Sequence, residues 1–80
     1  MNVKLIRMSS GEDVVANVIE EKESSVVLEE PIVAVPTGSG QLGFAPWSPL
    51  LSPSQKELEV PLQFIVYITE VPSVVRIYWA

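Results

Sequence analysis

The chain has 80 residues, the length of one domain, and carries ten acidic residues against five basic ones, with no histidine and no cysteine. The lack of cysteine excludes disulfides and thiolate zinc sites. The net charge is −5, so the chain does not have the excess of basic residues that most nucleic-acid-binding proteins carry. Hydrophobic residues make up 48% of the chain, more than so small a domain buries alone. We therefore expect one domain, residues 1–80, that forms a homo-oligomer.

The N-terminal half predicts three strands joined by two polar turns. Apolar residues alternate along each strand, and the turns hold Gly11 and a run of glutamates. Because proline cannot donate to a ladder, Pro31 should mark a bulge or the end of pairing. The predicted strands are Val3 to Met8, Val14 to Ile19, and Ser25 to Glu30 with a continuation over Ile32 to Val35.

The middle of the chain is apolar but interrupted. Gln41 to Leu51 contains Gly43, Pro46 and Pro49, which exclude a regular central strand or a helix. The sequence predicts a short strand at Leu42 to Ala45, followed by an ordered loop that Trp47 holds down.

The C-terminal third predicts apolar strands. Leu58, Val60 and Leu62 alternate with polar residues or proline and lead into a strand from Phe64 to Thr69. Val74 to Trp79 follows a tight break and is ambiguous, because Pro72-Ser73 suits a helix start, while the β-branched residues favour a strand.

Phe64 to Thr69 and Val74 to Trp79, read as strands, place apolar side chains on both faces of the sheet. This pattern is expected where other protein covers both faces. Copies of the chain should therefore join edge to edge. The predicted interface residues are Phe64, Val66, Ile68, Val74, Ile77 and Tyr78.

Two parts of the chain form a recognisable pattern. The first comprises Val3-Lys4-Leu5-Ile6-Arg7-Met8-Ser9-Ser10-Gly11, Val14-Val15-Ala16-Asn17-Val18 and Val26-Val27-Leu28. The second comprises Phe64 to Thr69, Glu70-Val71-Pro72-Ser73 and Val74 to Tyr78. Together they resemble the Sm-like family, whose closing motif the second part resembles. More narrowly, Met1 to Asp13 and Gly40 to Leu50 look like the small Sm-like proteins of marine cyanophages and ocean metagenomes.

This resemblance implies an all-β fold: a five-stranded, strongly bent antiparallel sheet that closes into a small Sm-like (SH3-like) barrel. It also implies a ring, from pentamer to heptamer, that binds single-stranded RNA or acts as an RNA chaperone. With no apolar run of about 18 residues and no signal-peptide pattern, we expect a cytoplasmic protein without membrane contact. A phage-encoded protein would occupy the host cytoplasm.

The chain departs from the family at its RNA-contacting positions. The family carries an Asp and an Asn-bearing stretch in the turn after the second strand, and an Arg-Gly or Lys-Gly pair between the last two strands. Here these turns read Glu20-Glu21-Lys22-Glu23-Ser24-Ser25 and Thr69-Glu70-Val71-Pro72. The predicted RNA-contacting residues are therefore limited to Arg7, Lys22, Ser24 and Ser25.

Two functions remain open. The resemblance favours an RNA-binding ring, whereas the acidic composition favours an assembly or adaptor ring that binds another protein through Trp47 and Phe44 without nucleic acid. Serine lacks an activating histidine or cysteine, and the turn carboxylates (Glu12, Asp13, Glu20, Glu21 and Glu23) fit solvated surface better than a metal or acid–base site. We therefore expect no enzymatic activity, no cofactor and no metal.

Overall fold

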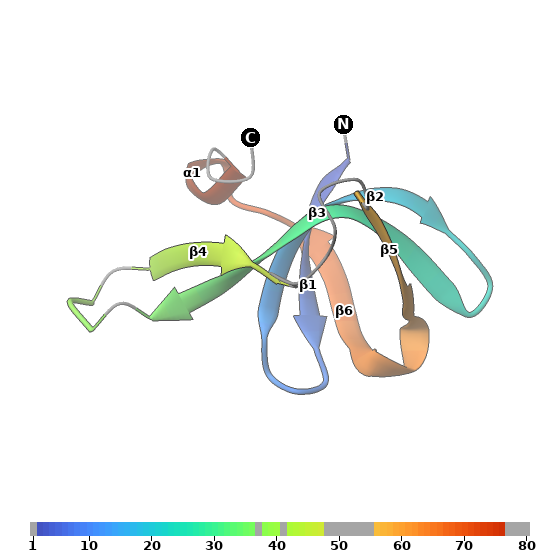
Figure 1. The fold of residues 1–80 in the computed structure, drawn as a ribbon, viewed down its shortest axis with the longest axis horizontal. Coiled ribbons are helices and arrows are strands. Elements are labelled where there is room, and N and C mark those ends of the chain that lie inside the picture. The colour runs from blue at the N-terminus through green and yellow to red at the C-terminus, as the bar shows by residue number, and fades with distance from the viewer. Residues whose placement is uncertain (1, 37, 41, 48–55, 77–80) are drawn as a thin grey trace.

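The protein is an antiparallel β-structure in the computed structural model, which describes residues 2–36, 38–40, 42–47 and 56–76 (Figure 1). The all-β prediction is confirmed, but the described residues form six strands rather than five. The strands are β1 (Val3–Met8), β2 (Asp13–Glu21), β3 (Ser25–Pro36), β4 (Leu42–Pro46), β5 (Glu57–Pro61) and β6 (Ile65–Glu70).

The first three strands form the predicted meander. Leu5 of β1 lies opposite Val15 of β2, and Val18 of β2 lies opposite Leu28 of β3. The turn between β1 and β2 needs a left-handed residue, which Gly11 supplies with a φ of 96°. These strands are therefore where the hydrophobic alternation places them.

A bulge divides β3 into two halves. The pairing with β2 shifts between Val15 and Asn17, which leaves Glu30 and Pro31 as the irregular step, with Glu30 at a φ of 50°. The half before the bulge pairs with β5 and the half after it pairs with β4, which projects as an arm (Figure 1). The predicted irregularity at Pro31 is confirmed.

The prediction of one continuous strand through Phe64 was wrong. Pro61 ends β5, because its ring offers no N–H to a ladder, and a 3-10 turn, η1 (Leu62–Phe64), then redirects the chain into β6. Val74 to Arg76 is also not a strand but part of a helical turn, α1 (Ser73–Arg76), in which the Val75 N–H donates to the Pro72 carbonyl at 2.9 Å. Ile77 to Trp79 lie outside the described residues.

The main core lies on one face of the bent sheet. Its buried members come from β1, β2, β3 and β5, and Ile6, Val14, Val26 and Leu28 are fully enclosed. Trp47, Leu58, Ile65 and Ile68 pack against this group from the side. Five strands (β1, β2, β3, β5 and β6) and Trp47, the residue after β4, thus converge on one cluster.

The strand order is β4-β3-β2-β1-β6, with β5 beside β3. Among the described residues no pairing joins β6 to β4 or β5, so hydrogen bonding leaves the sheet open. No helix of this described part is long and apolar enough to cross a membrane.

Candidate functional site

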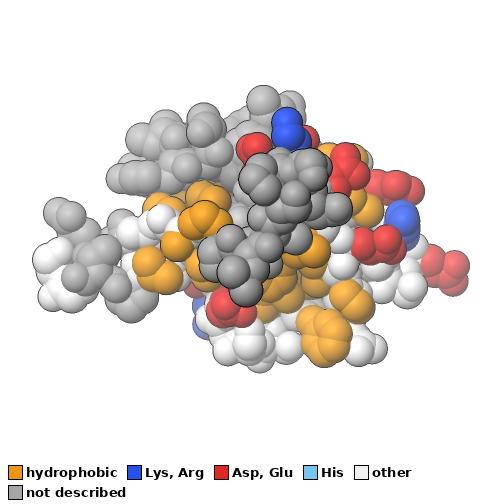
Figure 2. Space-filling model, in the orientation of Figure 1, with side chains coloured by type: hydrophobic (Ala, Val, Ile, Leu, Met, Phe, Trp, Pro, Cys, Tyr) orange, Lys and Arg blue, Asp and Glu red, His pale blue; other side chains and the backbone are white. Residues whose placement is uncertain are grey.

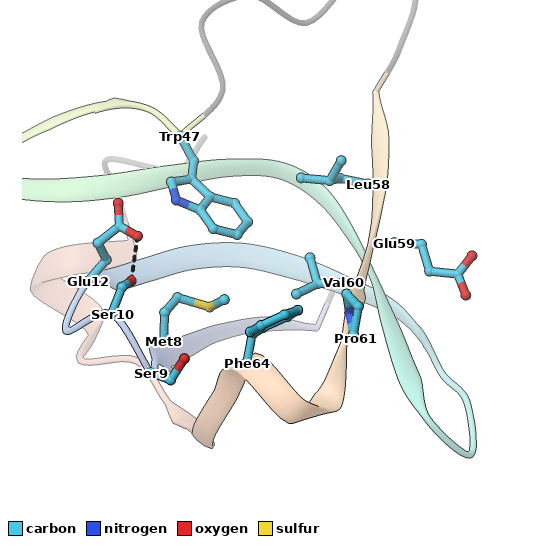
Figure 3. Close-up of a pocket in the computed structure, with 10 residues that line it drawn as sticks. All are labelled: Met8, Ser9, Ser10, Glu12, Trp47, Leu58, Glu59, Val60, Pro61 and Phe64. Atoms are coloured by element: carbon cyan, nitrogen blue, oxygen red, sulfur yellow. Dashed lines mark hydrogen bonds between the residues drawn. The ribbon is translucent and has the colours of Figure 1, made fainter.

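A cavity of about 410 Å³ opens beside the core. Figure 3 shows Trp47 on one side and Phe64 on the other, with the space between the two rings. The remaining apolar lining comes from Met8, Leu58, Val60 and Pro61. Pockets of this size accommodate one or two side chains or a small ligand.

Trp47 reaches the cavity because the β3 bulge holds its backbone. Its N–H donates to the Pro31 carbonyl at 3.0 Å, and the neighbouring Glu30 N–H donates to the Lys56 carbonyl at 3.2 Å. The two ends of the connection between β4 and β5 are therefore attached to the same step of β3. This attachment places the indole against the core cluster, whereas the loop that Trp47 was predicted to hold down lies outside the described residues.

The 3-10 turn η1 supplies the opposite wall. The Phe64 carbonyl accepts the Ser9 N–H at 2.8 Å, which ties η1 to the β1–β2 turn. At the other end of η1, the Leu62 N–H donates to the Ser24 carbonyl at 3.0 Å. The Phe64 side chain keeps 45% of its surface exposed, so its ring is available to a ligand.

The polar rim of the cavity carries carboxylates and hydroxyls but no basic side chain among its described lining residues. Glu12 accepts a hydrogen bond from the Ser10 hydroxyl at 2.8 Å. Glu59 lines the cavity with its backbone side, while its carboxylate points away (Figure 3). Glu12 is thus the charge that a bound molecule would meet.

The outward carboxylate of Glu59 links β5 to the β2–β3 turn. It accepts the hydroxyl of the buried Ser25 at 2.6 Å and lies 3.4 Å from the ammonium of Lys22. The Ser25 hydrogen bond, followed by the Lys22 charge, lowers the pKa of Glu59 below its ordinary value. Around this end of the molecule acidic side chains outnumber basic ones (Figure 2).

The predicted RNA-contacting residues do not converge. One guanidinium nitrogen of Arg7, Nη1, donates to both carboxylate oxygens of Asp13 at 2.9 Å, and Asp13 raises the pKa of Arg7. Lys22 lies at the other end of β2, where it pairs with Glu59. Ser25 is buried and Ser24 is exposed in the adjoining turn. These residues form no continuous basic surface.

The other predicted contact residues are spread over three places. Trp47 lines the cavity, whereas Phe44 lies half-buried in β4 opposite Ala34. Of the predicted interface set, Val66 is exposed on β6, Phe64 faces the cavity and Ile68 packs against the core. For Val74, only its place in α1 is described, and Ile77 and Tyr78 lie outside the described residues.

The sequence did not predict the floor of the cavity or the 3-10 turn η1 that forms its wall. Met8 and Val60 were read as ordinary strand residues, and Pro61 as a polar-face position in a strand. The available signal was Pro61 itself, since a proline cannot donate to a ladder and is confined to edge strands, strand ends or bulges. No group of acidic residues in the described ranges is arranged to hold a metal ion.

No protein-family model matches the chain, and no curated protein matches it either.

Proposed function

We propose that this protein is a homo-oligomeric adaptor, Sm-like in fold, that binds another protein in the cavity between Trp47 and Phe64 and uses no nucleic acid. The observation that carries the proposal is the lining of that cavity: two aromatic rings over an apolar floor, with a carboxylate and no described basic group at the rim. Phosphate ligands require cations or backbone donors at the site, whereas aromatic anchors are typical of protein contacts.

The basic residues support the same choice over the RNA-binding ring that the resemblance implies. Arg7, Lys22 and Lys4 each contact a carboxylate, on Asp13, Glu59 and Glu70. A phosphate would therefore compete with an existing partner at each position. A symmetric ring multiplies the ten carboxylates as well as the five basic residues of each copy. Oligomerisation therefore leaves the net charge of the assembly, and the electrostatic potential that it produces, negative.

The strand order supports the barrel and ring components of the proposal. Consecutive strands β5 and β6 belong to opposite ends of the path β5-β3-β2-β1-β6 and are joined only by η1. So short a connection requires the sheet to curl until its ends approach, which is the geometry of a small barrel. The outer edge of β6 pairs with no described strand and carries exposed Val66 and Tyr67, as expected for an edge that a second copy covers.

The proposal is tested by placing a photo-reactive p-benzoylphenylalanine at position 64 and irradiating the protein in a lysate of its source organism. We expect a protein adduct that Trp47→Ala or Glu12→Arg suppresses, and that the same probe at Val35, exposed on the β3–β4 arm and outside the cavity lining, does not reproduce. Circular dichroism would establish that both variants keep their strands. Salt-sensitive binding of labelled oligouridine or oligoadenine, without a protein adduct, would refute the proposal in favour of RNA.

A further inference from the structure

We infer that the cavity takes a short, extended, proline-containing segment of the partner, with an apolar side chain between Trp47 and Phe64 and a basic side chain beside Glu12. This inference rests on the proposed adaptor function and names the chemistry of its ligand. Three features of the cavity carry it: its shape, an unused hydrogen-bond donor, and the sign of its rim.

The shape favours an inserted side chain over a flat contact. The two rings face each other across the opening, and Met8 and Val60 close the floor (Figure 3). A volume of about 410 Å³ is small for the several anchor residues that an amphipathic helix presents along one face. An extended segment instead delivers one or two side chains and continues across the rim.

The unused donor favours a peptide backbone in the polyproline conformation. Among the ten lining residues, the Trp47 indole N–H has no hydrogen-bond partner, and its side of the ring is turned toward Glu12 rather than Leu58 (Figure 3). A polyproline II segment makes no internal hydrogen bonds, so its carbonyls are free to accept from an indole. Aromatic-lined grooves recognise such segments because their stiffness lowers the ordering cost.

The rim determines the charge of the segment. Glu12 is exposed, and the only described hydrogen bond of its carboxylate is with the neutral Ser10 hydroxyl. The basic residues nearest in sequence, Lys4 and Arg7, are already paired with Glu70 and Asp13. An arginine two or three residues from the inserted side chain would therefore complement Glu12, while an acidic residue there would be repelled.

The test is fluorescence anisotropy with three labelled proline-rich decapeptides that differ only at one flanking position, which is arginine, glutamine or glutamate. We expect the arginine peptide to bind several-fold more tightly than the glutamine peptide, and the glutamate peptide more weakly still. Glu12→Gln should remove the difference between arginine and glutamine, whereas the matched control Glu23→Gln, in the β2–β3 turn away from the cavity, should preserve it.

Two further measurements complete the test. Trp47→Phe keeps an aromatic wall but removes the indole donor, so it should weaken the arginine peptide several-fold without loss of fold. Equal binding of the three peptides, or their displacement by oligouridine, would overturn the inference. If the position-64 probe captures a protein but no peptide binds, the adaptor function stands and this ligand chemistry is wrong; if neither occurs, both fail.

Discussion

Val66→Lys should dissociate the proposed oligomer. Val66 keeps 63% of its surface exposed in the single chain, and full burial of a valine side chain is worth about 1.5–3 kcal/mol. Covering the exposed part in a neighbour would therefore contribute about 1–2 kcal/mol per contact. Lysine forfeits this term and adds a buried ammonium that costs several kcal/mol more. The combined loss of about 3–5 kcal/mol weakens the dissociation constant by roughly two to four orders of magnitude.

Sedimentation velocity over a wide concentration range measures this change directly. The wild-type protein should sediment well above its monomer mass of 8.8 kDa, and the lysine variant should shift to that mass. Val35→Lys is the matched control, because Val35 is also an exposed valine but lies on the β3–β4 arm. A wild-type monomer at high concentration, or an oligomer unaffected by Val66→Lys, would refute the proposed edge-to-edge contact.

Three predictions concern the subunit itself. Leu28→Ala should cost about 2–5 kcal/mol in urea unfolding, because the side chain is fully buried in the core; a loss within experimental error would place the core elsewhere. Gly11→Ala should cost about 1–2 kcal/mol through its φ of 96° alone, since an added Cβ meets no atom within 4 Å, and an unchanged unfolding midpoint would contradict this turn geometry. The folded-state pKa of Glu59 is lowered by Ser25 and Lys22, so its stabilisation is present above the unfolded pKa and lost as pH falls through the folded value. Glu59→Gln should flatten this acid limb of the stability profile, and a profile identical to the wild type would show that the Ser25–Glu59 link contributes nothing.

The sequence was a good guide wherever burial follows a period of two. The core-cluster residues of β1, β2 and the first half of β3 recur at a spacing of two, and a slip of one residue would move all of them to the opposite face of the sheet. Their strands and the bulge at Pro31 were therefore predictable without coordinates. The break at Leu62–Phe64 was not, because Leu58, Val60 and Leu62 continue the alternation across Pro61 and mask the point where pairing stops.

The candidate site was predictable only in part for a related reason. Trp47 stood out as an aromatic residue between prolines, but its partners Met8 and Phe64 come from β1 and η1, whose meeting depends on the path of the chain. Phe64 was predicted as an interface residue because periodicity assigns a face and does not say what lies opposite. The pairing of Arg7 with Asp13 likewise follows from strand register, which placed a carboxylate beside the expected phosphate contact.

The bulge at Glu30 and Pro31 connects these observations. If β3 were regular along its whole length, the edge that faces away from β2 would pair with a single strand. β4 and β5 could then not pair with two halves of β3 and run in different directions. The irregular step lets β5 cross over the core while β4 turns outward, and it also supplies the carbonyl and the N–H that hold Trp47 and Lys56. The cavity exists because β5 and Trp47 approach the same core cluster from the two sides of this step. The position of the proposed binding site is therefore a consequence of one local departure from sheet regularity, for which a proline without a backbone donor is the sequence determinant.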